Sequence, residues 1–368
     1  MPVPTPQLGS YKYVQETKAD LDWADLITID LSLYSTPEGR KQLARTLITA
    51  VREKGFFYVN NFNISQERVD RQFAIGRDFY ELPLGEKQNY TVDGLDQGKF
   101  NGYVPAGRRI LEEKSGLRDQ VEIYNIPKFT EHFEHKHPKI IDDRLAEIKE
   151  FAKSLHAEVL DPLHVLLAIA LELPEDYFTS RHKYEVKSED HLRYMKYNKY
   201  TPEEYAKLGE LIVRGHTDLG SWTLLFRQPV AGLQIKDHSS GEWKWVKPQD
   251  ATLTVNTCDA LSLLTANYVK STIHRVAVPP KDQQHVDRLG LLYFSRPYND
   301  VRLSTITESP VLQREGFTQN RFEATGNPAP TMDEWTFAKQ KWQRTKGYAS
   351  AEYENAQILP GWNERKYT

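Results

Sequence analysis

The residues best suited to chemistry in this chain are His216 and Asp218, which flank Thr217, and His274 further along. Together they offer two imidazole nitrogens and one carboxylate oxygen. Three ligands on one face of an octahedral ferrous ion leave three coordination positions open for O2 and a co-substrate. A closed structural zinc site would need four ligands, usually including thiolates, and the chain has a single cysteine. The residue types therefore favour an open, catalytic iron site.

The spacing of these residues predicts how they meet. Residues i and i+2 of a strand point to the same face, so we expect His216 and Asp218 to enter one cavity from a single strand. Gly215 and Gly220 bracket the motif and disfavour a helix there. His274 lies in a second apolar run, residues 271–279, which also resembles a strand. A His-x-Asp motif alone recurs by chance, and this context is what gives it weight.

Composition excludes several classes of function. The 368 residues carry a formal net charge of −3, which argues against a protein that grips nucleic acid through its phosphates. No apolar run approaches the roughly 20 residues needed to cross a bilayer, and the N-terminus lacks the apolar centre of a signal peptide. The lone Cys258 excludes an internal disulfide framework and fits a reducing compartment. We expect a cytoplasmic enzyme with a small-molecule substrate and neither a nucleic-acid nor a membrane partner.

The first half of the chain alternates strand and helix patterns. Residues 26–31 alternate apolar and polar side chains, and residues 55–59 form a short apolar run, so both predict strands. Apolar residues at helical spacing predict helices over residues 37–54, 65–82 and 142–173. Pro162 lies inside the last of these ranges, so we expect a break or kink at that point.

From His191 onward the pattern changes to short β-rich runs separated by turns. These runs cover residues 211–213, 223–226, 232–235, 243–246, 252–255, 261–264, 272–278 and 289–295. Short strands at this spacing favour a sandwich or barrel over a parallel sheet with intervening helices. Residues 332–353 again predict a helix, opened by the capping-box pair Thr331 and Glu334.

These elements predict a mainly β fold with flanking helices, built as a single domain over residues 1–368. Its expected parts are a helix-rich region over 1–190, a β core with the metal site over 191–300, and a C-terminal helix and tail over 301–368.

Several longer stretches carry a resemblance to a known family. They are residues 27–31, 55–59, 102–107, 216–226, 232–235, 255–259, 270–276 and 288–294. In these stretches the chain resembles the 2-oxoglutarate- and Fe(II)-dependent oxygenases of the isopenicillin N synthase-like family. The resemblance implies a distorted double-stranded β-helix, or jelly roll, as the core. It also implies that His216, Asp218 and His274 are the iron ligands.

The resemblance implies that Arg288 anchors 2-oxoglutarate. This co-substrate chelates the iron through its keto oxygen and one carboxylate, so its distal carboxylate needs a partner. A planar guanidinium matches a carboxylate with two parallel hydrogen bonds. Tyr200 and Asn198 match family positions that contact the same co-substrate. Arg275, beside His274, is the rival cation, but within a strand it should point to the opposite face.

Gly290 departs from the family pattern, in which a serine hydroxyl follows the arginine as Arg-x-Ser. One interpretation is that arginine and tyrosine suffice and that Gly290 makes room, for instance for a water. The other is that a different electron source, or the substrate itself, replaces 2-oxoglutarate, as in the oxidase branch of the family. A lost neutral hydrogen bond costs only about 1 kcal/mol, so we favour the first interpretation.

Four further residues are candidates for substrate contacts: Tyr103, Arg108, Tyr124 and Trp222. The two tyrosines lie where the resembled family builds its substrate pocket, Arg108 could hold an acidic group at the pocket mouth, and Trp222 follows the metal loop. Each could equally belong to the core or the surface. By analogy with the resembled family, we expect a chain with 20 Tyr, 15 Phe and 7 Trp to act on a small or medium natural product and not on a polymer.

The resemblance thus implies an oxidoreductase that uses Fe(II), 2-oxoglutarate and O2 on a small organic metabolite, of the kind found in specialised metabolism. Decarboxylation of 2-oxoglutarate to succinate and CO2 would drive hydroxylation, desaturation or an oxidative rearrangement. An alternative is a 2-oxoglutarate-independent iron oxidase of the isopenicillin N synthase type. A non-catalytic binding protein is the third hypothesis, and such a protein would be expected to lack one of the three ligands.

Overall fold

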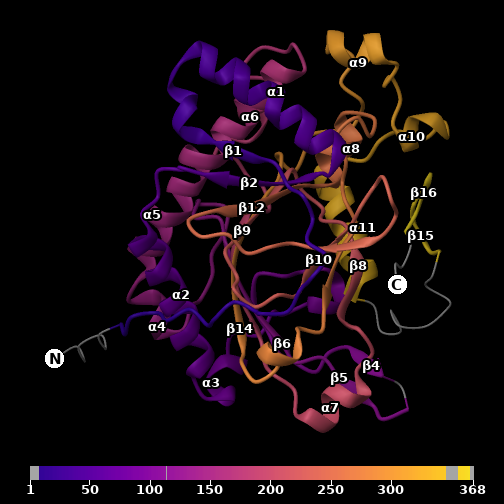
Figure 1. The fold of residues 1–368 in the computed structure, drawn as a ribbon. Helices are drawn as coiled ribbons and strands as arrows, with labels where there is room; N and C mark the ends of the chain where they lie inside the picture. The colour runs from indigo at the N-terminus through magenta and orange to yellow at the C-terminus, as the bar shows by residue number, and fades with distance from the viewer. Residues whose placement is uncertain (1–7, 113, 345–354, 365–368) are drawn as a thin grey trace.

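Two β-sheets form the centre of the computed structural model, which describes residues 8–112, 114–344 and 355–364 (Figure 1). The larger sheet contains, in spatial order, β1 (Thr28–Asp30), β2 (Phe56–Asn60), β12 (Leu253–Thr257), β9 (Trp222–Phe226), β14 (Arg288–Ser295), β7 (His191–Tyr197), β6 (Val121–Pro127) and β3 (Gly102–Val104). The smaller sheet contains β11 (Trp243–Trp245), β10 (Leu233–Lys236), β13 (His274–Ala277) and β8 (Leu211–His216). Only the β1–β2 pair within these two sheets is parallel.

The two sheets pack face to face, which confirms the predicted mainly β, jelly-roll core. Alternate residues of β2 and β9 point to opposite faces of the larger sheet. Phe56 and Tyr58 face the smaller sheet, where they form a buried cluster with Ile235. Phe57 and Leu224 face the other way and belong to the main hydrophobic core. The larger sheet is therefore buried on both faces.

Helices cover the outer face of the larger sheet, on the left of Figure 1. They are α1 (Pro37–Glu53), α2 (Gln66–Glu81), α5 (Leu145–Leu155) and α6 (Asp161–Ala170). Their apolar faces and the outward side chains of the sheet make one cluster, in which Leu47, Phe79 and Leu167 are buried. These helices confirm the ranges predicted from apolar periodicity.

Shorter elements complete the described chain. Those before β14 are α3 (Leu84–Gln88), β4 (Ile110–Glu112), β5 (Leu117–Arg118), α4 (Lys139–Asp142), α7 (Pro202–Lys207) and α8 (Asp259–Leu264). Those after it are α9 (Pro310–Glu315), α10 (Arg321–Ala324), α11 (Met332–Arg344), β15 (Gln357–Leu359) and β16 (Trp362–Asn363). The predicted C-terminal helix is thus present to Arg344, and residues 345–353 of that prediction lie outside the described residues.

Three expectations from the sequence need correction. Residues 261–264, predicted as a strand, belong to helix α8, because a short apolar run does not distinguish a buried strand from a buried helix. Pro162 does not break its helix. A π-helical turn over His156–Leu160 precedes it and places the proline in the first turn of α6, where its missing N–H is tolerated. Finally, β3 and β6 were not predicted as strands. Together with the predicted strands β1 and β2 they extend the same sheet as β7, β9, β12 and β14.

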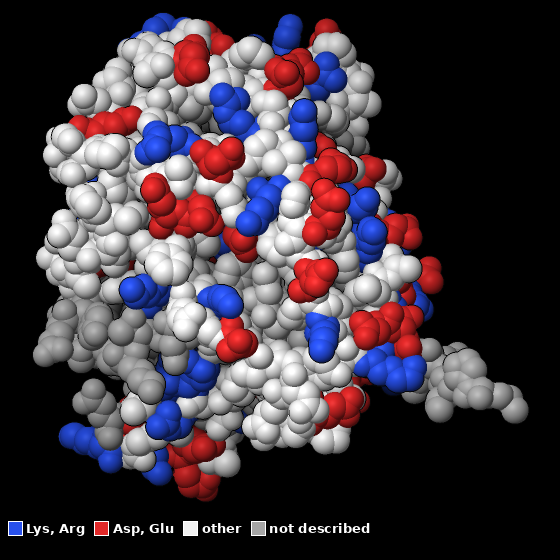
Figure 2. All heavy atoms as spheres, turned by 180° about the vertical axis from the view of Figure 1, so that it is seen from behind, with Lys and Arg blue, Asp and Glu red and all other residues white. Residues whose placement is uncertain are grey.

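Charged side chains of both signs cover the face of the molecule shown in Figure 2. Acidic and basic side chains are interspersed over the face shown in Figure 2, instead of gathering into a basic patch. Within the described part of the chain, no helix combines the length and hydropathy of a membrane span.

Candidate metal centre

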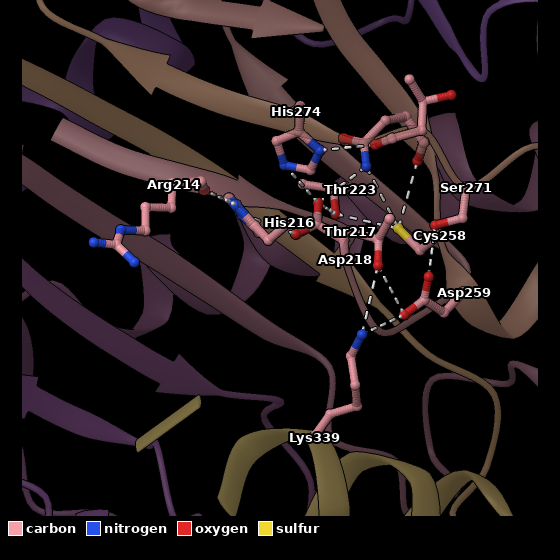
Figure 3. Close-up of polar contacts among 12 residues, drawn as sticks. Arg214, His216, Thr217, Asp218, Thr223, Cys258, Asp259, Ser271, His274 and Lys339 are labelled. Atoms are coloured by element: carbon pink, nitrogen blue, oxygen red, sulfur yellow. Dashed lines mark hydrogen bonds and ion pairs between the residues drawn. The ribbon is translucent and has the colours of Figure 1, made fainter. Parts of the chain in front are cut away.

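The side chains of His216, Asp218 and His274 converge between the two sheets (Figure 3). One ligand atom from each lies within 4.8 Å of the others, and no other such group of His, Cys, Asp or Glu occurs among the described residues. The Nε2 atoms of His216 and His274 are 3.9 and 3.7 Å from the Asp218 carboxylate oxygens. The His216 side chain is 30% exposed, so one side of the triad is open. This donor set fits an open octahedral Fe(II) site.

The local geometry differs from the expected single strand. β8 ends at His216, and Asp218 lies in the turn that follows it. The two histidines are direct cross-strand partners in the β8–β13 ladder, which brings their rings to 4.4 Å. Convergence therefore comes from pairing of two distant strands, and the turn carries Asp218 towards both rings.

Backbone carbonyls orient both imidazole rings. The Nδ1 atom of His216 lies 3.0 Å from the carbonyl oxygen of Arg214, and the Nδ1 atom of His274 lies 3.1 Å from that of Thr272. When Nδ1 donates to a carbonyl, the Nε2 lone pair remains for a metal. Burial, with His274 nearby, lowers the pKa of His216 to about 4. The ring is therefore neutral at ordinary pH, as a metal ligand must be.

Asp218 is held as a carboxylate by two donors from the larger sheet. The Thr223 hydroxyl and the Asn256 amide donate to its Oδ2 atom at 2.7 and 2.9 Å. Burial alone would raise the pKa of Asp218, but the two histidines and these hydrogen bonds lower it to about 2. Such partners fix the rotamer of a ligating carboxylate and keep it ionised.

A buried ion-pair network supports the turn that carries Asp218. Asp259 accepts hydrogen bonds from Thr217 and Ser271 at 3.2 and 2.7 Å, and its backbone N–H donates to the Asp218 carbonyl oxygen at 2.9 Å. Lys339, which rises from α11 in Figure 3, lies 3.1 Å from the Asp259 carboxylate and 2.9 Å from that of Glu364. Burial would lower the pKa of Lys339, but the two carboxylates raise it above its ordinary value. The C-terminal segment therefore braces the metal loop.

Arg288 is buried at the start of β14 with polar atoms left unpaired. Its Nε and Nη1 atoms are buried and have no hydrogen-bond partner, and its guanidinium lies 4.9 Å from the ring of Tyr197. It lines a cavity with Asn198 and Val276, the latter two residues beyond His274. A buried guanidinium with unpaired donors is costly unless an anion completes it.

The position of the missing serine is filled by another side chain. A Cβ atom at Gly290 would come closer than 3.0 Å to the Nε2 atom of Gln228, a separation that real Cβ atoms essentially never show. Gln228 is buried, its Oε1 atom has no partner, and it lines a cavity with Arg288. Gly290 therefore makes room for a glutamine amide. Only the approach of two distant segments reveals this, and no local pattern signals it.

The other two residues predicted to contact the co-substrate have hydrogen-bond partners within the protein. Asn198 donates to Glu122 at 3.1 Å. The hydroxyl of Tyr200 accepts from the backbone N–H of Gln120 at 3.0 Å. The tyrosine paired with Arg288 across the strands is Tyr197, which the motif did not single out.

Arg275 points away from the metal side, as expected. Its Nε donates to Gln234 at 2.7 Å, and its guanidinium lies 4.0 Å from the ring centre of Trp243. Both groups belong to neighbouring strands of the smaller sheet, so Arg275 is occupied away from the triad.

Three of the predicted substrate contacts lie in the helix-facing core. Trp222 alternates with Thr223, so it points away from Asp218, and it packs at 5.9 Å from Phe57. Tyr103 and Tyr124 are cross-strand partners whose rings pack against Phe79 of α2 at 5.9 and 4.3 Å. This placement does not favour a substrate role for these residues. Arg108 is exposed, and its role at a pocket mouth stays a prediction.

Comparisons with known proteins agree with this geometry. Residues 26–144 match the model of the non-haem dioxygenase in morphine synthesis N-terminal family, and residues 189–297 match that of the 2OG-Fe(II) oxygenase superfamily. The chain belongs to the 2-oxoglutarate/Fe(II) oxygenase family. It is an enzyme that uses Fe(II), 2-oxoglutarate and O2 to oxidise a small molecule.

The alignments with individual relatives cover most of the chain of this oxygenase. The 2-oxoglutarate-dependent dioxygenase frbA of a Dothideomycetidae species is 28% identical over 313 residues, which span 78% of this chain and 90% of the relative. A 1-aminocyclopropane-1-carboxylate oxidase of Dictyostelium discoideum is 26% identical over 318 residues, or 76% and 83% of the two chains. The crystal structure of a full-length Neurospora crassa protein in complex with alpha-KG superposes with a TM-score of 0.73 at 21% identity, covering 89% of this chain and 99% of that one. The last similarity shows the shared fold.

Proposed function

We propose that His216, Asp218 and His274 hold the Fe(II) of this oxygenase and that Arg288 anchors the distal carboxylate of 2-oxoglutarate. The observation that carries the first assignment is the convergence of three ligand atoms within 4.8 Å, with both Nδ1 atoms facing backbone carbonyls. The second is supported by the buried, unpaired guanidinium of Arg288 in a cavity that borders β13. The bound iron and co-substrate supply the activation of O2 for attack on a C–H bond.

The protein contributes orientation and charge. Asp218 stays ionised because Thr223 and Asn256 donate to it, so it can hold a cation without first losing a proton. Arg288 offers two parallel donors to a carboxylate. Burial of these groups between the sheets excludes water and strengthens each electrostatic contact.

Gln228 takes the place of the family serine in this proposal. Its amide fills the space above Gly290 and lines a cavity with Arg288. An Nε2–H donor there can complete the binding of the distal carboxylate. This assignment replaces the interpretation of an empty or water-filled position.

The 2-oxoglutarate-independent oxidase remains the second candidate, because a relative named as an oxidase is 26% identical. The main argument against it is Arg288. An enzyme without a dicarboxylate co-substrate would leave the buried Nε and Nη1 donors unpaired, at a cost of about 1–3 kcal/mol for each unsatisfied group.

A small metabolite is the substrate class we propose. The solved structures of the same Neurospora crassa protein include one in complex with thymine, and this shared fold supports a pocket of similar scale. We also propose a cytoplasmic location, which the single, free and buried Cys258 supports.

The decisive experiment measures succinate formation by the purified, iron-loaded protein under air. We expect turnover that requires both Fe(II) and 2-oxoglutarate and that Asp218→Ala abolishes while the far-UV circular dichroism stays unchanged. The exposed Asp300 offers a matched control, so Asp300→Ala should keep full turnover. Equal O2 consumption with and without 2-oxoglutarate would instead favour the oxidase.

A further inference from the structure

Arg296 is a buried cation that the proposed chemistry does not use. It follows β14 directly, is 2% exposed, and its Nη1 atom has no hydrogen-bond partner. No ion pair to its guanidinium occurs among the described residues, although the charges of Glu189 and Asp190 act on it at longer range. The Oδ1 atom of Asp190 already accepts from the Arg296 backbone N–H at 2.8 Å and from Ser188 at 3.0 Å, and its Oδ2 atom accepts from Tyr293 at 3.4 Å. The Nη1 atom of Arg296 therefore still lacks an acceptor.

A second guanidinium, that of Arg193, belongs to the same cluster. The Arg296 guanidinium lies 4.8 Å from the ring centre of Phe100, which is 4.9 Å from the ring of His191. His191 stacks on Phe294 at 4.6 Å and 13°, and the Arg193 guanidinium lies 4.4 Å from the centre of the Phe294 ring. The rings of Phe100, His191 and Phe294 thus connect the two guanidinium groups.

This cluster lies beside the metal triad. Phe294 is the cross-strand partner of Thr223, whose hydroxyl donates to Asp218. Burial lowers the pKa values of both Arg193 and Arg296, although the charge of Asp218 raises them in part. The cluster therefore lies on the face of the larger sheet from which Thr223 holds Asp218, opposite the smaller sheet that carries His216 and His274.

Two groups of the cluster remain partly accessible. Arg193 and Phe294 lie on central strands of the larger sheet and point between the sheets, yet both are partly exposed. The Arg193 Nε atom donates to Asn125 at 2.7 Å, and this bond holds its guanidinium over the Phe294 ring.

From this arrangement we propose that Arg193 and Arg296 bind the carboxylate of the substrate, so that the enzyme oxidises a small organic acid with an apolar or aromatic body. A carboxylate matches the planar guanidinium fork, and the rings of Phe100, His191 and Phe294 offer it an apolar wall. The proposal rests on the proposed function, because it places the acid beside the iron triad. The distal carboxylate of 2-oxoglutarate is a different anion, since Arg288 stands at the opposite end of β14 from Arg296.

The test uses the full chain loaded with Mn(II), which is paramagnetic, and with saturating 2-oxoglutarate. The probe is phenylacetate, and phenylacetamide is its neutral counterpart of nearly equal shape. Proton relaxation of each probe reports binding near the metal. We expect the acid to bind at least about tenfold more tightly than the amide, because hydrogen bonds to charged groups are the stronger ones.

Three variants locate the binding site of the acid. Arg296→Gln removes the charge and should weaken phenylacetate binding about tenfold or more, whereas Arg296→Lys should lose less. The exposed Arg45 on α1 supplies the matched control, and Arg45→Gln should bind the acid like the wild type. All variants should bind 2-oxoglutarate with unchanged affinity, which also shows that they are folded.

The outcomes separate this proposal from the proposed function. Relaxation of the methylene protons of 2-oxoglutarate is read in the same samples, and its absence would count against the proposed function alone. The acid site is overturned if phenylacetamide binds as well as phenylacetate, or if Arg296→Gln leaves acid binding unchanged. It is also overturned if phenylacetate merely displaces 2-oxoglutarate, or if millimolar phenylacetate shows no relaxation in the wild type.

Discussion

Replacement of Gly290 by serine, which would restore the usual family residue, should damage co-substrate binding in this enzyme. The added Cβ would come closer than 3.0 Å to the Nε2 atom of Gln228. Gln228 is buried, so its amide cannot simply swing into solvent. The serine therefore displaces the Gln228 amide from the space beside Arg288. The serine hydroxyl is then poorly placed next to the displaced glutamine side chain.

The size of the effect follows from the hydrogen bond that is lost. A donor to a charged acceptor contributes about 1.5–3 kcal/mol, which corresponds to roughly 10- to 100-fold in the dissociation constant of 2-oxoglutarate. Gln228→Ala should lose the same bond and weaken binding by a similar factor. The double variant with Gly290→Ser and Gln228→Ala has room for the serine hydroxyl, so we expect it to return to within about threefold of the wild type.

Isothermal titration of the Mn(II)-loaded variants with 2-oxoglutarate measures this cycle. Gly209→Ser is the matched control, because a Cβ there meets nothing within 4 Å, and its affinity should not change. If the losses of 2-oxoglutarate affinity were additive in the double variant, the glutamine and serine side chains would not compete for the same space beside Arg288. Wild-type affinity in Gln228→Ala would refute a contact between Gln228 and the co-substrate.

Three further predictions follow from buried ionisable side chains. Arg288→Ala should raise the KM for 2-oxoglutarate at least about tenfold, and an unchanged KM in succinate assays would remove Arg288 from the site. Lys339→Met leaves the buried Asp259 without its cation, so we expect a loss of about 3–5 kcal/mol in the free energy of unfolding by urea; a loss below about 1 kcal/mol would contradict the bracing role. Burial lowers the pKa of His182 from 6.5 to about 4. Between these pH values the unfolded chain binds a proton that the folded chain does not, so stability is complete above pH 6.5 and should fall by about 1.4 kcal/mol per pH unit on acidification towards 4. His164, whose ring centre lies 4.0 Å from that of His182 and whose ring nitrogens have no hydrogen-bond partner, adds to this loss because burial also lowers its pKa. His164→Leu should flatten the profile of urea midpoint against pH, and an unchanged slope would exclude His164 as a cause.

The sequence was informative where one local pattern carries the chemistry. His216 and Asp218 are close in the chain and His274 lies in a recognisable strand, so the triad could be found without a structure. The helices that cover the sheet were predicted because their apolar periodicity is strong. Residues 261–264 were assigned to the wrong element because a run of four residues with three leucines is too short to show a clear period.

The remaining features depend on contacts between distant segments. Lys339 reaches Asp259 from the C-terminal helix, and nothing in its neighbourhood distinguishes it from a surface lysine. Gln228 reaches Gly290 only because β9 and β14 are neighbours. Trp222 follows the metal loop but points outward, because Thr223 takes the inward position of the strand. Such registers are set by tertiary packing, which a single sequence does not reveal.

The most direct test of the account is the iron content of the protein after anaerobic loading and removal of loosely bound metal. We predict close to one Fe(II) per wild-type chain and almost none after Asp218→Ala or His274→Ala, with the folded circular dichroism spectrum retained in both. Full iron occupancy in either variant would show that these side chains do not hold the metal.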